Sequence, residues 1–201
     1  NLTYILYRYC VLGTYLDHAE PDTVIMAWRL ASGLPLYYPI EAAEHFTTAY
    51  GPMLFILTAL PLKLLGPSIT VSKIASTCAL GTSAIIFGYY TWRRYGFVYV
   101  GLGIMAFTFY PLIVSPVSFW VRPEAHTVLL VTLALLSTLA ANGDRRWVIG
   151  IIVAACAGLA MNLKIHSFIY FIPLVFRYCS HNWLQIWPIM ACVTILVFLL
   201  P

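Results

Sequence analysis

Long apolar runs, rather than alternating apolar and polar positions, dominate this chain. The runs cover residues 53–65, 69–91, 97–110, 124–141, 147–161, 167–176 and 183–201. Unbroken apolar runs are typical of buried helices, whereas the strands of a barrel alternate with a period of two. The pattern therefore predicts an all-α helical bundle.

Proline, glycine and charged residues separate these runs. Gly66-Pro67-Ser68 closes the run 53–65, and two prolines, Pro111 and Pro116, interrupt residues 97–120. Because proline removes a backbone donor and breaks helices, we expect a broken, partly re-entrant passage over 97–120. Residues 1–16 are shorter than the roughly 20 that a full span needs, so they are expected to be the outer part of a first helix.

The composition assigns these helices to a lipid environment. The chain is 62% hydrophobic and only 9% charged, with a mean hydropathy of +0.87, whereas a soluble domain is about 25% charged. We expect an all-α integral membrane protein, a polytopic helical bundle. The basic residues Lys63, Lys73, Arg145 and Arg146 should face the cytoplasm. The net charge of +4 is small and spread out, so no nucleic-acid partner is expected.

Most of the acidic residues lie in one stretch, which we expect to form an outer loop over residues 17–52. Five of the seven carboxylates fall there, namely Asp17, Glu20, Asp22, Glu41 and Glu44. Glu20-Pro21-Asp22 favours the start of an amphipathic surface helix near 22–32, which Gly33 would end. Such a concentration of carboxylates indicates either chemistry or a solvated loop.

Metal and disulfide sites have little support in the sequence. The five cysteines are odd in number and form no CxxC pair, so they are interpreted as core residues. His18, His45 and His166 could help a carboxylate to bind a divalent ion, with hydrogen-bonded structural roles as the alternative. No cofactor is assigned, and a divalent metal remains open.

Several short motifs follow one another in a familiar order. They are Glu20-Pro21-Asp22, Ala27 to Gly33, Leu36-Tyr37, Tyr50-Gly51-Pro52, Gly66-Pro67-Ser68, Trp120-Val121-Arg122-Pro123-Glu124 and Lys164. This order resembles the GT-C class of membrane glycosyltransferases, in particular the dolichyl-phosphate-mannose-protein mannosyltransferase and aminoarabinose transferase superfamily. The chain departs from the family pattern at Gly51, where proline is usual, at Glu124, where aspartate is commoner, and at Lys73, where arginine is expected.

The resemblance implies a site for sugar transfer. Such a reaction needs a carboxylate that accepts the acceptor's proton and cations that hold the leaving phosphate. Glu20 and Asp22 are the candidate catalytic residues, with Asp17 as the next choice. The candidate substrate-binding residues are Arg122, Glu124, Lys164 and Tyr38. Arg122 has an alternative role in an ion pair with Glu124 or the acidic loop, and Tyr38 has one as an interfacial anchor.

Two functions remain open. The first is a glycosyltransferase that moves a sugar from a polyprenyl-phosphate donor to an acceptor at the outer face of the membrane, with the lipid-linked donor and membrane lipids as partners. The second is a catalytically silent, truncated relative that serves as a structural subunit of a larger membrane complex. Family members run to several hundred residues, so residues 1–201 are interpreted as a single GT-C-like module from a fragment or truncated form. The expected location is the bacterial inner membrane, with the acidic loop outside.

Overall fold

The computed structural model describes residues 2–39, 41, 49–109, 119–139, 146–179 and 183–200, and the regular elements in those ranges are all helical. They are α1 (Leu2–Val11), α2 (Ala19–Ala31), α3 (Pro52–Leu65), α4 (Ile69–Ser72), α5 (Ile74–Tyr95), α6 (Phe97–Phe109), α7 (Pro123–Leu139), α8 (Arg146–Leu163), the 3-10 helix η4 (Ile165–Phe171), α9 (Ile172–Cys179) and α10 (Trp183–Phe198).

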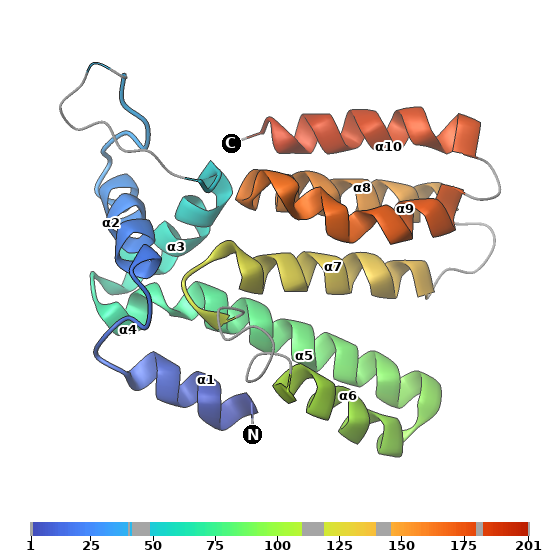
Figure 1. Ribbon diagram of the computed structural model, residues 1–201, viewed down its shortest axis with the longest axis horizontal. Helices are drawn as coiled ribbons and strands as arrows, with labels where there is room; N and C mark the ends of the chain where they lie inside the picture. The colour runs from blue at the N-terminus through green and yellow to red at the C-terminus, as the bar shows by residue number, and fades with distance from the viewer. Residues whose placement is uncertain are drawn as a thin grey trace.

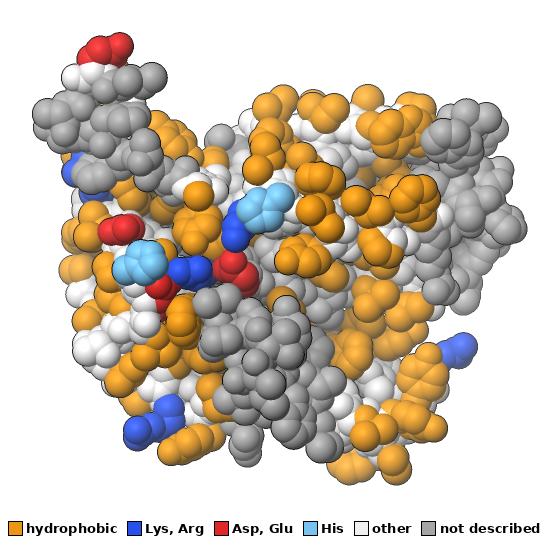
Figure 2. Space-filling view, in the orientation of Figure 1, with side chains coloured by type: hydrophobic (Ala, Val, Ile, Leu, Met, Phe, Trp, Pro, Cys, Tyr) orange, Lys and Arg blue, Asp and Glu red, His pale blue; other side chains and the backbone are white. Residues whose placement is uncertain are grey.

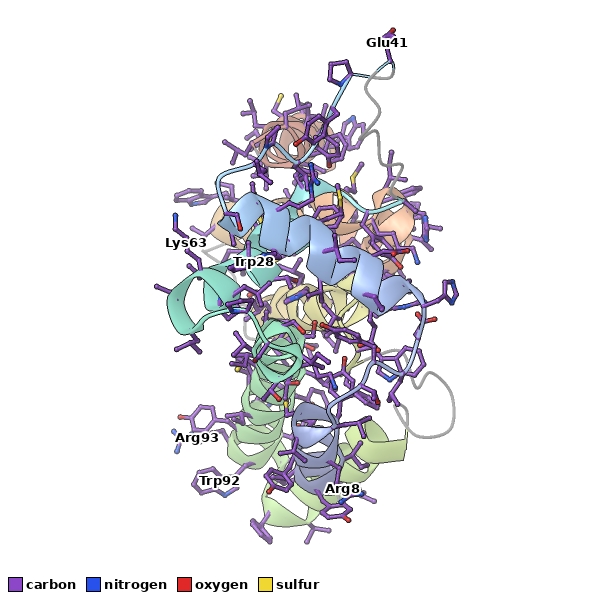
Figure 3. All side chains as sticks on the ribbon, turned by 90° about the vertical axis from the view of Figure 1, so that its left-hand side faces the viewer. Arg8, Trp28, Glu41, Lys63, Trp92 and Arg93 are labelled. Atoms are coloured by element: carbon purple, nitrogen blue, oxygen red, sulfur yellow. The ribbon has the colours of Figure 1, made fainter. Side chains whose placement is uncertain are left out.

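The longer helices lie side by side, and α2, α3 and α4 gather at one end of them (Figure 1). The neighbours in the row are α6, α5, α7, α8 and α10, in that order. The view onto the end of the row shows α2 crossing in front of the other helices (Figure 3). The largest buried apolar cluster fills the space between α7, α8, α9 and α10, with Val153 and Ala160 fully enclosed.

The prediction of a helical bundle is confirmed, and most helices form close to the expected residues. α3 begins at Pro52, α8 covers the predicted range 147–161, and α10 begins at Trp183, as expected. The run 69–91 is divided into α4 and α5 at Lys73. In the passage over 97–120, α6 covers Phe97–Phe109, and the two prolines, where the break was expected, lie outside the described residues.

The prediction of an integral membrane protein is wrong, because the described helices are too short or too polar to cross a membrane. Within the described residues, no helix is both long and apolar enough to cross a membrane. A helix rises 1.5 Å per residue and needs about 20 apolar residues to cross a hydrocarbon core. α3 has 14 residues, α7 has 17 and α10 has 16. α5 reaches 22 residues, but serine, threonine and glycine interrupt it and Arg93 and Arg94 end it. The membrane location and sidedness predicted from composition are therefore not supported.

Helix α2 forms where the acidic stretch predicted a helix, although it begins three residues earlier. It packs on α3 through Ala27, which is fully buried among Ala59 and Leu62. Gly33 ends the helix as predicted, since its φ of +80° lies in the left-handed region that glycine adopts without strain. The helix predicted to lie on a membrane surface is instead a packed element of the bundle.

A close backbone contact fixes the start of α3 against the end of α8. The Gly51 N–H donates to the carbonyl of Leu163 at 3.1 Å, and a Cβ at Gly51 would overlap the carbonyl oxygen of Asn162. The buried Asn162 side chain accepts from Met53 N at 2.9 Å and donates to the carbonyl of Phe198 at 2.8 Å. Position 51 therefore accepts glycine alone.

Candidate functional site

Four charged side chains meet at one end of the row of helices. α7 and α8 are antiparallel neighbours, so the start of α7 lies beside the end of α8 and brings Arg122 and Glu124 close to Lys164. Asp17, in the connection from α1 to α2, reaches the same place. We call Asp17, Arg122, Glu124 and Lys164 the charge cluster. Figure 2 shows acidic, basic and histidine side chains gathered near the middle of one face.

Two ion pairs hold the charge cluster together. Arg122 Nη2 donates to Asp17 Oδ2, and Lys164 Nζ lies 3.2 Å from Glu124 Oε1. The Asp17 and Arg122 side chains are 11% and 18% exposed, so this pair is shielded from water more than a surface pair. His18 Nδ1 lies 2.9 Å from the other oxygen of Asp17. Cations and carboxylates thus meet in a partly buried place, where charge has more effect than at the surface.

The buried carboxylate of Glu20 fixes the backbone next to the charge cluster. Glu20 is fully buried, and Oε2 accepts from Leu16 N at 2.8 Å while Oε1 accepts from Val121 N at 3.0 Å. The hydroxyl of Tyr9 also donates to Oε1. Burial and the neighbouring Glu20 raise the pKa of Tyr9. Because Leu16 precedes Asp17 and Val121 precedes Arg122, Glu20 fixes the backbone on both sides of their ion pair.

Lys73 supports the same region by a different route. Its side chain is fully buried, and Nζ donates to the carbonyls of Tyr9, Leu12 and Thr14 at 2.8 to 2.9 Å. Burial lowers the pKa of Lys73. These bonds tie the end of α1 to the start of α5. The prediction that Lys73 marks a cytoplasmic turn is wrong, because this cation is inside the protein.

Some polar atoms around the charge cluster have no partner. Trp120 Nε1, Arg122 Nε and Glu124 Oε2 are buried and make no hydrogen bond within the described part of the chain. Buried polar atoms normally find a partner, and each exception needs a cause such as a bound water or ligand. Two of these atoms are donors and one is an acceptor. A bound water or ligand that offers both kinds of group would satisfy them.

An apolar groove adjoins the charge cluster. It has a volume of about 490 Å³, and its lining is formed by residues of α1 and of the segment after it, among them Tyr4, Leu12 and Leu16, together with Phe119. Its lining includes Leu16, which directly precedes Asp17, and none of the four residues of the charge cluster. We call it the α1 groove. Its size falls within the range of about 300–1,000 Å³ that is usual for small-molecule pockets.

Other predicted site residues lie elsewhere. Asp22 is exposed on α2, and Tyr38 accepts a hydrogen bond from Arg29 Nη2 at 2.6 Å. Glu41 lies at the far tip of the acidic stretch (Figure 3), and Glu44 and His45 fall outside the described residues. In the part of the chain that the structure describes, no three His, Cys, Asp or Glu side chains form a group that could hold a metal ion.

Sequence reasoning missed three contributors to the site. The Tyr9 hydroxyl donates a hydrogen bond to Glu20. The ring centroid of Trp120 lies 5.9 Å from the guanidinium carbon of Arg122, and the ring centroid of Tyr50 lies 6.0 Å from Lys164 Nζ. Burial, then the nearby Glu124, raises the pKa of Tyr50. Trp120 and Tyr50 belong to the motifs that carry the resemblance, so their place in those motifs could have indicated that they lie at the site. Nothing in the sequence pointed to Tyr9.

Comparison with known proteins identified no relative of this chain. No family model matches the chain, and no curated protein or solved structure matches it significantly. The fold and the site define the protein as an all-helical bundle with a partly buried charge cluster beside an apolar groove.

Proposed function

We propose that this protein is a glycosyltransferase that moves a sugar from a polyprenyl-phosphate donor to a hydroxyl acceptor, with the charge cluster as its site. The observation that carries the proposal is the meeting of Asp17, Arg122, Glu124 and Lys164 from three distant parts of the chain. Sugar transfer from a phosphate needs a proton acceptor and cations within one site, and the cluster contains both.

The phosphate binds to Arg122 and Lys164. Arginine presents a planar fork that matches phosphate oxygens, and lysine adds a point charge. Arg122 Nε is a buried donor without a partner, so a phosphate oxygen would satisfy it. Phosphate binding to Arg122 competes with the Asp17 ion pair and releases the Asp17 carboxylate for the acceptor.

Asp17 then serves as the base. The acceptor oxygen attacks the anomeric carbon of the sugar, the bond from that carbon to the phosphate oxygen breaks, and the acceptor's proton passes to Asp17. The polyprenyl phosphate leaves with the bonding electrons, and the two cations stabilise its charge. Glu20 is excluded as the base because it is fully buried and its oxygens already accept three hydrogen bonds. Glu20 is a positioning residue.

The α1 groove supports a polyprenyl rather than a nucleotide carrier. Its lining is mainly apolar and includes Leu16, the residue before Asp17. An isoprenoid chain in this groove would place its terminal phosphate at the charge cluster. Each buried CH₂ group of such a chain adds about 0.8 kcal/mol to binding.

Binding of undecaprenyl phosphate tests the proposal. We expect Arg122→Gln and Lys164→Gln each to weaken binding by about tenfold or more, since a hydrogen bond to a charged group is worth about 1.5–3 kcal/mol. Lys63→Gln is the matched control, because Lys63 is exposed on α3 and points away from the bundle (Figure 3). Unchanged affinity in both cluster variants would refute phosphate binding at this site.

The groove is tested separately with Gly13→Trp. A Cβ at Gly13 would meet no atom within 4 Å, and Gly13 lines the α1 groove, so we expect tryptophan at this position to enter the groove. This variant should lose affinity for undecaprenyl phosphate and keep its affinity for inorganic phosphate. Equal binding of undecaprenyl phosphate by Gly13→Trp and the unmodified protein would show that the polyprenyl chain binds outside the α1 groove.

A non-catalytic subunit of a larger complex is the second candidate function. The observation that favours it is a set of exposed large side chains around the α5–α6 turn, namely Tyr89, Trp92, Tyr95, Phe97 and Val98. Exposed apolar patches are typical of protein interfaces. Absence of sugar transfer, together with stoichiometric co-purification that Phe97→Glu abolishes, would favour this function over the first.

A further inference from the structure

A second apolar groove lies on the other side of α7, where α3, α5 and α7 meet. It has a volume of about 470 Å³, and its lining includes Leu60 and Leu64 of α3, Cys78 and Thr82 of α5, and His126 of α7. We call it the α3/α5/α7 groove. His126 follows Glu124 by two positions, which turns it about 200° around the helix and away from the charge cluster. The proposed sugar transfer makes no use of this groove.

His126 is the unusual member of the lining. It is only 6% exposed, and its Nε2 atom has no hydrogen-bond partner within the described residues. A buried polar atom without a partner is costly, so its place in the lining of a groove indicates a missing partner. Leu64 and Leu65 at the rim are 72% and 66% exposed, which leaves a large apolar surface uncovered.

The surroundings of His126 select the chemistry of that partner. Burial lowers the pKa of His126 to about 4, so the imidazole is neutral at pH 7. Neutral Nε2 is a donor in one tautomer and an acceptor in the other, and a hydroxyl can complement either. A carboxylate or an ammonium ion would enter this apolar place without an opposite charge, which is unfavourable. A hydroxyl therefore fits better than a charged group.

We propose that the α3/α5/α7 groove binds an apolar chain that ends in a hydroxyl, with the chain along Leu60 and Leu64 and the hydroxyl bonded to His126 Nε2. The chain is either a straight alkyl alcohol or an isoprenoid alcohol, which share this chemistry. A slender chain is favoured over a protein surface because His126 is only 6% exposed, while Leu64 and Leu65 of the same lining are largely exposed. The site is independent of the charge cluster, so its failure leaves the proposed function unaffected.

Protection of Cys78 from iodoacetamide tests this proposal in the full chain. Cys78 is exposed in the groove, and Cys192 of α10 is exposed outside it and serves as an internal control. The rate of alkylation at each cysteine is read by peptide mass spectrometry with 1-octanol, farnesol, octanoate or octane present. We expect 1-octanol or farnesol to slow alkylation of Cys78 at least fivefold and to leave Cys192 unchanged. Protection by one alcohol alone identifies the type of chain.

Two variants separate the hydroxyl from the apolar chain. His126→Leu should weaken the protection by 1-octanol about tenfold, to the level given by octane. Thr82→Trp adds a large side chain at the exposed rim and should abolish protection without a change in the core. The proposal is overturned if octane or octanoate protects as well as 1-octanol, if Thr82→Trp leaves protection unchanged, or if Cys78 is protected only as the protein concentration rises.

Discussion

Replacement of Glu20 tests the buried hydrogen-bond network that supports the charge cluster. In Glu20→Ala, the Leu16 N–H and the Tyr9 hydroxyl lose their acceptor, whereas the Val121 N–H keeps the Tyr9 hydroxyl oxygen at 3.1 Å. A donor left without a partner costs about 1–3 kcal/mol, so these two groups together cost about 2–6 kcal/mol. Glu20→Gln keeps one acceptor oxygen, so its stability should lie between that of Glu20→Ala and that of the unmodified protein.

The assay is thermal unfolding followed by circular dichroism. For a chain of this size, 1 kcal/mol shifts the melting temperature by about 2–4 °C, so Glu20→Ala should lower it by at least about 4 °C. Asp22→Ala is the matched control, two positions away on the same helix, and its exposed side chain, in the first turn of α2, should change stability by less than about 1 kcal/mol. If the two variants melt at the same temperature, the buried network around Glu20 does not exist as described.

Three further changes test other parts of the structure. Gly51→Ala should cost about 1–3 kcal/mol in denaturant unfolding because its Cβ meets the Asn162 carbonyl, whereas Gly81→Ala, in open space, should not destabilise. Lys73→Met should cost about 2–4 kcal/mol, since three carbonyls lose their donor. The lowered pKa of His126 means that its stabilisation is complete above pH 6.5 and is lost as the pH falls to about 4, roughly 3 kcal/mol in all. His126→Leu should remove that part of the pH dependence, and an unchanged pH profile would contradict it.

The helices could be predicted from the sequence, but their environment could not. The apolar runs and their proline and glycine boundaries place α3, α8 and α10 well, because periodicity and helix breakers act locally. Composition then suggested spanning helices, although the run 69–91 is divided at Lys73. A buried lysine with three carbonyl partners cannot be recognised from its neighbours in the sequence.

The sequence names the residues of the candidate site, but it cannot rank them. The structure pairs Asp17 with Arg122 and Glu124 with Lys164, and the roles of these residues stay a prediction. Helical periodicity puts Glu20 and Asp22 on different faces of α2, and only the tertiary fold decides which face is buried. The chain bends so that Glu20 meets Val121, about a hundred residues later. Such long-range contacts leave no local signal.

The most direct test of the central claim is the turnover of a lipid-linked sugar by Asp17→Asn. The donors are undecaprenyl-phosphate-linked mannose and aminoarabinose, with released or transferred sugar measured at saturating donor. A general base contributes about 10²–10⁴-fold to rate, so kcat should fall by that factor while KM for the donor stays within about twofold. Asp22→Asn, with its exposed side chain, should retain full kcat. Full kcat in Asp17→Asn, or no turnover of either donor by the unmodified protein, would contradict the assignment of the charge cluster as a glycosyl-transfer site.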